Sequence, residues 1–110
     1  MVKKNRDSGL SDFGRFSEPA LLILISLADG PKHGYAMVED ILSVAGVRLG
    51  PGTLYGAISR LESRGLIKAL KPDHRRNPYR LTGAGERSLR QRLQSLAAVA
   101  RAGEERLASA

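Results

Sequence analysis

The chain has 110 residues with a net charge of +7 at pH 7, no cysteine and no tryptophan. This length suits one domain with a modest aliphatic core and excludes a deep enclosed active site beside that core. The lack of cysteine excludes disulfides and thiol chemistry, and the lack of a signal peptide or of a ~20-residue apolar run predicts a soluble cytoplasmic protein with no membrane partner.

The amino-terminal half is predicted to hold an arm and two helices. Residues 1–16 carry no sustained apolar period, and their cations either touch phosphates or belong to a flexible solvated arm. A first helix is predicted from about Pro19 to Ala28; it is apolar nearly all round and therefore buried. A second helix is predicted from about Gly34 to Ala45, with one apolar face. The alternation of Val47–Leu49 predicts a small edge strand.

A third helix has an unusual composition. Pro51 suits its first turn and Gly65 supplies a left-handed stop after it. Its apolar stripe should face the core, whereas two glycines and two serines on the opposite face lower helix propensity without improving solubility. We therefore expect another molecule to approach this outer face. The candidate contact residues are Gly52, Thr53, Tyr55, Gly56, Ser59, Arg60 and Ser63.

A basic hairpin is predicted after the third helix. Leu66–Lys71 and Tyr79–Leu81 have the pattern of short strands, and Pro78 cannot donate to a ladder, so its strand should be an edge. Three helices followed by such a hairpin predict a mainly α (α+β) winged helix-turn-helix, with the third helix in the major groove and the hairpin, or wing, on the flanking backbone or minor groove. The wing candidates are Lys68, Lys71, His74, Arg75 and Arg76.

The last segment is predicted to be one long helix that Thr82 caps. Apolar or small residues recur along it at spacings of 4, 3, 4, 3 and 4, a heptad seam that predicts a homodimer contact. The alternative is that this helix folds back on the first helix of its own chain. The seam consists of Leu89, Leu93, Leu96, Ala100, Gly103 and Leu107. We thus assign residues 1–16 to the arm, 17–81 to the winged helix-turn-helix and 82–110 to a dimerisation helix.

Positive charge is concentrated in the second half of the domain. Between Arg48 and Arg92 there are eleven Lys or Arg against three acidic residues, whereas the rest of the chain has seven against eight. A basic stripe around a helix with a small outer face is typical of proteins that bind nucleic acids. Charge alone is equally consistent with a generic basic surface.

Several short motifs, in order, resemble the PadR family of bacterial transcriptional regulators. They are Lys32-His33-Gly34-Tyr35, Gly52-Thr53-Leu54-Tyr55, Ser59-Arg60-Leu61-Glu62 with Gly65-Leu66-Ile67, and Tyr79-Arg80-Leu81-Thr82 with Gly85. The resemblance covers about residues 18–90. It implies a homodimeric repressor whose third helix and wing bind a palindromic operator in double-stranded DNA. Some members release DNA when they bind phenolic acids or hydrophobic drugs, so the resemblance also implies a small-molecule inducer as a partner.

The chain departs from the family pattern at two places. Gly83-Ala84 follow Thr82 where members usually carry acidic residues, so we predict a weak start for the last helix. There is no tryptophan to form the aromatic sandwich that drug-binding relatives use for planar ligands. With its single C-terminal helix, the chain is similar to the short branch of the family.

The roles of individual site residues stay open at this point. Arg60 is the strongest candidate for reading a base, because a guanidinium can bond two acceptors of guanine at once, and a phosphate contact or an ion pair with Glu62 is the alternative. Tyr55 either faces the groove or packs its ring on the core and offers its hydroxyl to a phosphate. The wing cations either neutralise phosphates or are solvated turn charges. His33 is expected to be a turn or cap residue.

No enzyme is expected. The two histidines lie forty-one residues apart without cysteine, which gives no recognisable zinc site, and Gly50-Pro51-Gly52 lacks the continuation of a phosphate-binding loop. We therefore predict no catalytic residues, no metal and no cofactor. The alternative function is a winged-helix module whose third helix docks an acidic protein.

Overall fold

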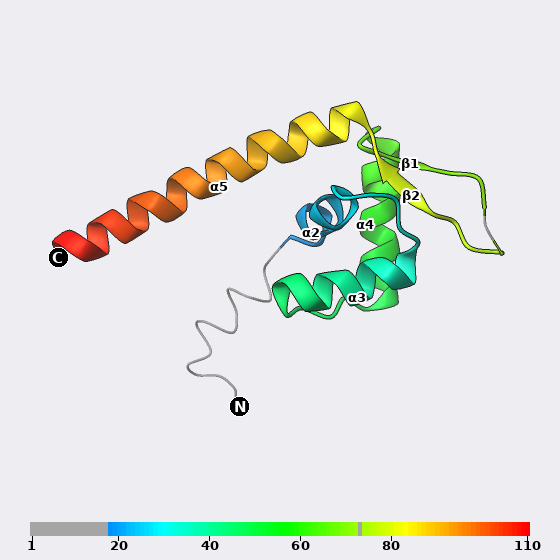
Figure 1. The fold of residues 1–110 in the computed structure, drawn as a ribbon, viewed down its shortest axis with the longest axis horizontal. Coiled ribbons are helices and arrows are strands. Elements are labelled where there is room, and N and C mark those ends of the chain that lie inside the picture. The colour runs from blue at the N-terminus through cyan, green and yellow to red at the C-terminus, as the bar shows by residue number, and fades with distance from the viewer. Residues whose placement is uncertain (1–17, 73) are drawn as a thin grey trace.

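The computed structural model describes residues 18–72 and 74–110. In chain order it contains α2 (Pro19–Leu27), α3 (Gly34–Ala45), α4 (Pro51–Ser63), β1 (Ile67–Ala69), β2 (Tyr79–Leu81) and α5 (Gly83–Ser109). The first three of these helices pack together, the hairpin leaves on one side, and α5 leaves on the other (Figure 1). This is a winged helix with a long C-terminal helix, as the sequence predicted. The predicted arm, residues 1–16, lies outside the described residues.

The core is aliphatic and centred on α2. This helix contacts α3, α4, α5 and β2, which is why it can be apolar on almost every side. The predicted inner stripe of α4, Leu54, Ile58 and Leu61, is buried against it. Burying one side chain of this size contributes about 1.5 to 3 kcal/mol, so the stripe compensates α4 for the low helix propensity of its outer face.

Lys32 and Ser26 hold the turn between α2 and α3. The ammonium of Lys32 donates to the backbone oxygen of Ser26 and to the carboxylate of Asp29, and this hydrogen bond, with the positive charge, lowers the pKa of Asp29 below its ordinary value. The buried hydroxyl of Ser26 donates to Oδ2 of Asp40 over 2.7 Å. These bonds connect the end of α2 to α3 and fix the start of the helix-turn-helix.

The wing is extended by a segment that the sequence did not indicate. Tyr79 donates its N–H to the oxygen of Lys32 over 2.9 Å and accepts the N–H of Lys32 over 3.1 Å, while on its other side it pairs in register with Ala69 of β1. β2 is thus an edge of the two-stranded sheet, as expected, and the single bridge to Lys32 covers its outer side at Tyr79. The strand expected at Val47–Leu49 is not formed, and Leu49 is buried in the core with Val47 packed against it.

α5 has a firmer start than the sequence predicted. The hydroxyl of Thr82 accepts the N–H of Gly85 over 3.0 Å and donates to the oxygen of Gly65 over 2.7 Å. The N–H of Thr82 donates to the oxygen of Leu66 over 3.1 Å, and Glu86 supplies an acidic first turn. The prediction of a weak start was wrong, because it counted only charges within the helix and missed these bonds to the turn after α4.

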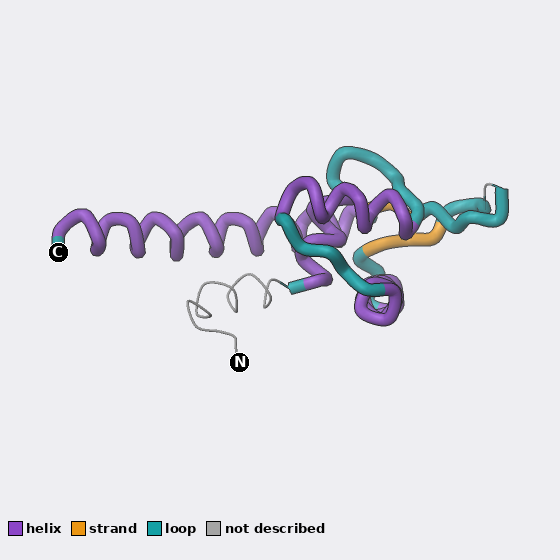
Figure 2. Tube along the Cα trace, turned by 90° about the horizontal axis from the view of Figure 1, so that it is seen from below, coloured by secondary structure: helices purple, strands orange, loops and turns teal. Residues whose placement is uncertain are grey.

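Beyond its first turns α5 projects away from the body (Figures 1 and 2). An ion pair of 2.6 Å joins Arg92 of α5 to Glu18, the N-cap residue of α2. The helix therefore does not fold back along α2 over its whole length. No helix within residues 18–72 and 74–110 is both long and apolar enough to cross a bilayer.

We predict that Gly85→Ala destabilises the fold. Gly85 is buried, and a Cβ added there would lie 2.0 Å from the oxygen of Leu66, a backbone atom that cannot move aside cheaply. We expect a loss of about 1 to 3 kcal/mol in the free energy of unfolding, measured by urea denaturation. Gly83→Ala is the control, because its Cβ would meet nothing closer than 3.5 Å. Equal stability of the two variants would contradict the contact between α5 and Leu66.

Candidate nucleic-acid interface

The outer face of α4 is exposed and nearly free of bulky side chains. A Cβ at Gly52 would meet no atom within 4 Å, and Gly56 is covered only by the guanidinium of Arg60, 3.6 Å from the position of such a Cβ. Thr53, which follows Gly52, and Ser59, one turn after Gly56, are also exposed. Another molecule can therefore approach the helix backbone along this face. Ser63 lies farther along the same face, with its hydroxyl donating to the oxygen of Arg60 over 3.0 Å.

Arg60 is exposed, and within the described part of the chain its side chain forms no hydrogen bond or ion pair. The pair with Glu62 that the sequence left open is not formed. The guanidinium thus lies on the outer face of α4 with all five donors available. Such a group can bond two acceptors of one guanine or the oxygens of one phosphate.

Of the two expectations for Tyr55, the one in which its ring packs on the core is wrong. Its side chain is 53% exposed, so the ring is not part of the core. Its hydroxyl lies against Gly34, the first residue of α3, because a Cβ at Gly34 would be only 2.4 Å from that oxygen. Tyr55 therefore bridges α4 and the start of α3 along the edge of the outer face.

The wing places cations opposite one another. Lys68 on β1 pairs in register with Arg80 on β2, and both side chains are exposed. Like charges directly across a ladder are unfavourable, and an anionic partner would offset that cost. Arg80 was not among the residues predicted for the wing, although the period-2 pattern of the two strands was a signal that could have placed it beside Lys68.

The tip of the wing bends sharply and returns to α3. His74 and Arg75 have positive φ angles of 49° and 69°, while Arg76 approaches His33 with 3.0 Å between Nη1 and Nε2. Because arginine can only donate, Nε2 of His33 is the acceptor in this contact. His33 is at the N-cap position of α3, as expected, yet its side chain bonds to the wing rather than to the helix.

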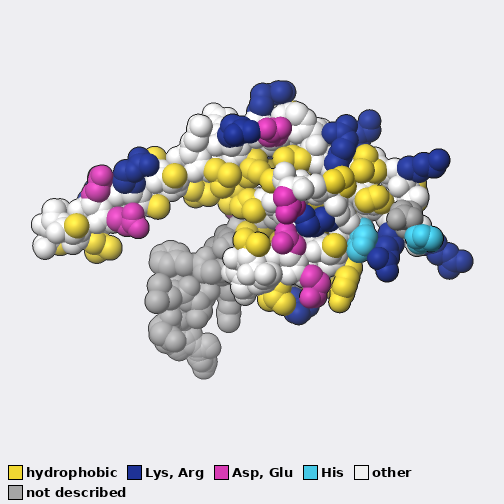
Figure 3. Space-filling view, in the orientation of Figure 1, with side chains coloured by type: hydrophobic (Ala, Val, Ile, Leu, Met, Phe, Trp, Pro, Cys, Tyr) yellow, Lys and Arg dark blue, Asp and Glu magenta, His cyan; other side chains and the backbone are white. Residues whose placement is uncertain are grey.

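Figure 3 shows Lys and Arg side chains over the wing and its tip, beside the two histidines of the chain. Lys71 and Arg75 are exposed and, within residues 18–72 and 74–110, have no hydrogen-bonding or ion-pairing partner. In the same described ranges no group of three His, Cys, Asp or Glu side chains is placed to hold a metal ion. The arrangement favours binding of an anion along α4 and the wing.

The predicted seam on α5 divides into two parts. Leu89 is 5% exposed and belongs to the core of its own chain, so it offers little surface to a second copy. Leu93 and Leu96 are 42% and 39% exposed, and Leu107 is 79% exposed. Ala100 and Gly103 are also exposed, and Val99 beside them adds an apolar residue that the heptad spacing did not include. The uncovered part of the seam thus begins at Leu93.

The sequence is similar to those of known regulators. Residues 23–91 match the profile of a family described as "Transcriptional regulator PadR-like family". The chain is 46% identical over 83 residues to an uncharacterized 37.1 kDa protein in transposon TN4556 of Streptomyces fradiae, covering 76% of this chain and 24% of that protein. The chain therefore spans about a quarter of the length of this relative.

Two further comparisons cover most of both partners. The chain is 37% identical over 84 residues to the transcriptional regulator Rv3488 of Mycobacterium tuberculosis, with 74% of this chain and 78% of that protein aligned. The crystal structure of a PadR family transcriptional regulator from Eggerthella lenta has a TM-score of 0.71 and 31% identity, covering 92% of this chain and 89% of that one. Fold and sequence thus point to the same family.

We predict that the candidate residues on α4 and the wing contribute little to folding. Arg60→Ala and Arg75→Ala remove exposed side chains without partners, so each should change the free energy of unfolding by less than about 0.5 kcal/mol. Leu54→Ala on the buried side of α4 should cost about 2 to 5 kcal/mol. Urea denaturation of the three variants tests this contrast. A loss for Arg60→Ala as large as that for Leu54→Ala would make Arg60 a structural residue.

Proposed function

Because this chain belongs to the PadR-like family of transcriptional regulators, whose members bind DNA and are not enzymes, we propose that it is a cytoplasmic homodimeric repressor of a palindromic operator. In this proposal residues 17–81 form the DNA-binding domain and residues 82–110 the dimerisation helix. The observation that carries it is the outer face of α4, which is exposed, nearly free of bulky side chains and flanked by cations without partners.

α4 is proposed to enter the major groove. Gly52 and Gly56 allow its backbone to come close to the base edges, and Thr53, Ser59 and Ser63 add only short side chains. Arg60 is assigned to base reading, because its exposed guanidinium has no intramolecular partner to lose on binding. Base contacts from this face would supply the sequence specificity.

The wing is proposed to bind the sugar-phosphate backbone. Lys68, Lys71 and Arg75 carry exposed cations without partners in the described part of the chain, and His74 and Arg76 complete the tip. Each phosphate that such a group neutralises releases counterions, so binding should weaken steeply as salt rises. The wing would thereby supply affinity and orientation on all duplexes.

Two copies are proposed to pair through α5. The exposed apolar surface from Leu93 to Leu107 projects beyond the body and has no cover within the described residues. The small residues Ala100 and Gly103 would let two helix backbones approach closely. A two-fold pair would present two α4 faces to one duplex, which is why the operator is proposed to be palindromic.

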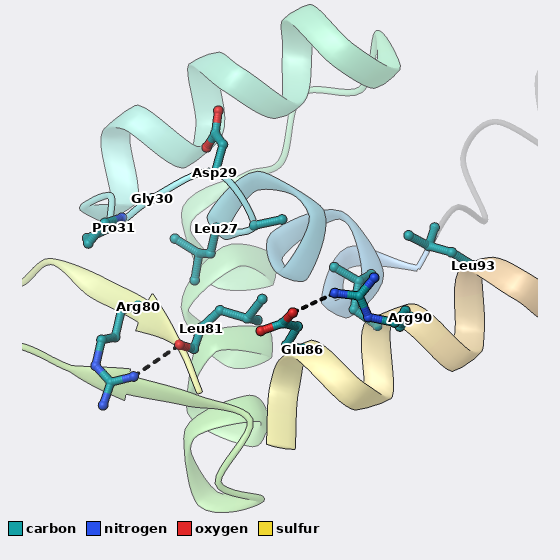
Figure 4. Close-up of a pocket in the computed structure, with 11 residues that line it drawn as sticks. Leu27, Asp29, Gly30, Pro31, Arg80, Leu81, Glu86, Arg90 and Leu93 are labelled. Carbon is teal, nitrogen blue, oxygen red and sulfur yellow. Dashed lines mark hydrogen bonds and ion pairs between the residues drawn. The ribbon is translucent and has the colours of Figure 1, made fainter. Parts of the chain in front are cut away.

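A cleft between the body and α5 is proposed as the site of a small hydrophobic or phenolic inducer. It measures about 590 Å³, and Figure 4 shows it between the turn after α2, strand β2 and the first turns of α5. Leu27, Leu81 and Leu93 provide apolar lining. Arg80 and Arg90 lie at the same cleft and could meet an anionic group, although each already bonds to a neighbour, the oxygen of Leu81 and the carboxylate of Glu86. A ligand there would change the exit direction of α5.

We predict that DNA binding divides between α4 and the wing. Arg60→Ala should reduce discrimination at one base pair by about 1 to 3 kcal/mol. The double variant Arg75→Ala with Arg76→Ala should weaken binding to all duplexes. It should also reduce the slope of log K against log salt by about 1 to 2. Sequencing of the DNA that the purified protein retains would supply the operator for fluorescence anisotropy. Absence of binding to operator and random DNA at low salt would overturn the proposal and favour the protein-docking alternative.

We also predict that Leu93→Asp gives monomers in sedimentation experiments. A carboxylate at this position would lie inside the proposed helix pair, where a charge is costly to bury. Operator binding should weaken by roughly 100-fold or more, because the two half-sites would no longer be engaged together. Ser95→Asp is the matched control, because Ser95 is exposed on the same helix and outside the seam. A Leu93→Asp protein that remains dimeric would exclude the seam as the contact.

A further inference from the structure

A hollow of about 260 Å³ lies between the tip of the wing, the first turn of α3 and Tyr55 of α4. The residues that line it include three tyrosines, Tyr35, Tyr55 and Tyr79, together with His33, Arg75 and Arg76. No acidic side chain is among the described residues that line it. We call it the tyrosine hollow.

We propose that the tyrosine hollow binds one phosphodiester group of the DNA backbone, with the hydroxyl of Tyr55 and the guanidinium of Arg75 as its ligands. The inference rests on the proposed DNA-binding function and adds a site to it, since neither the groove contacts of α4 nor the other cations of the wing require this hollow. A phosphate contact here would position α4 in the groove without reading sequence.

The pairing of Gly34 with Tyr55 is the first observation behind this site. A Cβ at residue 34 would lie 2.4 Å from the hydroxyl oxygen of Tyr55 and 3.0 Å from its Cζ. The hydroxyl therefore occupies its present position only because residue 34 has no side chain. In the described part of the chain this hydroxyl has no hydrogen-bonding partner, so it is available to donate to an oxygen that enters the hollow.

The second observation is the division of roles between the two arginines. Arg76 is held by His33 over 3.0 Å, so it frames the hollow and adds positive charge to it. Arg75 precedes it in the tip, is exposed, and has no partner within the described ranges. A phosphate oxygen would give Arg75 the charge-assisted bond that it lacks, and such bonds are about twice as strong as neutral ones.

Tyr79 closes the hollow on the side of β2. Its backbone is fixed on both sides, by Ala69 and by Lys32. Burial raises the pKa of its phenol above the ordinary value, with smaller contributions from the charges of Glu62 and Tyr55. The phenol therefore stays neutral, and the hollow keeps the positive charge of its arginines.

Three variants test the site in duplex binding. Tyr55→Phe removes only the hydroxyl, Gly34→Ala displaces it, and Arg75→Gln removes the charge. Each should weaken binding to operator and random DNA alike, by roughly tenfold, because each loses a hydrogen bond to a charged group. The double variant of Gly34→Ala and Tyr55→Phe should bind no more weakly than the weaker single variant, since both changes remove the same contact.

The controls are Gly83→Ala and Arg101→Gln, which make the same chemical changes on α5, outside the hollow. Thermal unfolding checks that each variant folds, and if Gly34→Ala does not, Tyr55→Phe and Arg75→Gln carry the test. In a second experiment, single phosphates of the operator are replaced by neutral methylphosphonates. One replacement should weaken binding of the unmodified protein and have little further effect on Tyr55→Phe and Arg75→Gln.

The outcomes separate this inference from the proposed function. If the unmodified protein binds duplex with a steep salt dependence and the three variants bind equally well, the tyrosine hollow is not a phosphate site. The role proposed for Arg75 in the wing is then also wrong, while DNA binding through α4 and the other wing cations stands. If additive losses appear in the double variant, the two residues act separately and the site as described is wrong. If the unmodified protein binds no duplex, both proposals are overturned.

Discussion

The attachment of α5 to the turn after α4 is the constraint on which the rest of the molecule depends. Thr82 bonds to Gly65 and Leu66, and Gly85 lies directly against the oxygen of Leu66. The end of α4, the start of β1 and the start of α5 are therefore in direct contact with one another. In the proposed dimer this junction would transmit the geometry of the helix pair to both α4 faces, because half-sites one helical turn of DNA apart require a fixed distance between them.

The composition of α4 follows from two opposing requirements. A slim outer face needs glycine and serine, which lower helix propensity, and the helix then depends on tertiary burial of its other side. Leu54, Ala57, Ile58 and Leu61 supply that burial, each with 3% exposure or less. Similarly, Lys68 and Arg80 face each other across the hairpin, and this repulsion between like charges lowers its stability. The backbone bridge between Tyr79 and Lys32, on the other side of β2, helps to offset that loss.

Local signals predicted the helices, whereas pairings between distant segments were not visible in the sequence. Prolines and glycines located the ends of α3 and α4 to within a residue or two, because they act on the backbone where they stand. The bridge between Lys32 and Tyr79 and the bond between His33 and Arg76 join residues more than forty positions apart, and no periodicity encodes such a partner. The tyrosine hollow and the bonds that support the start of α5 could not be predicted for the same reason, because they too join residues that are distant in the sequence. For the proposed DNA contacts, the sequence supplied the residue types, and the structure adds which of them are exposed and without partners.

The exposure of the distal part of α5 is the strongest physical reason to expect that this helix packs against a second copy of the chain. From Arg90 to Ser109 every residue is exposed except Ala102, which is half covered. Most of the stability of a protein helix comes from tertiary packing of its apolar face rather than from helix propensity, and this stretch has little such packing within the described residues. The ion pair between Arg92 and Glu18 anchors only the near end. Packing of Leu93, Leu96 and Leu107 against an identical helix would supply the missing stabilisation and would remove from water the apolar surface that a monomer exposes. The stability of this helix and the two-fold presentation of α4 would then have the same origin, so that folding of the tail and recognition of a palindrome are proposed to be thermodynamically linked.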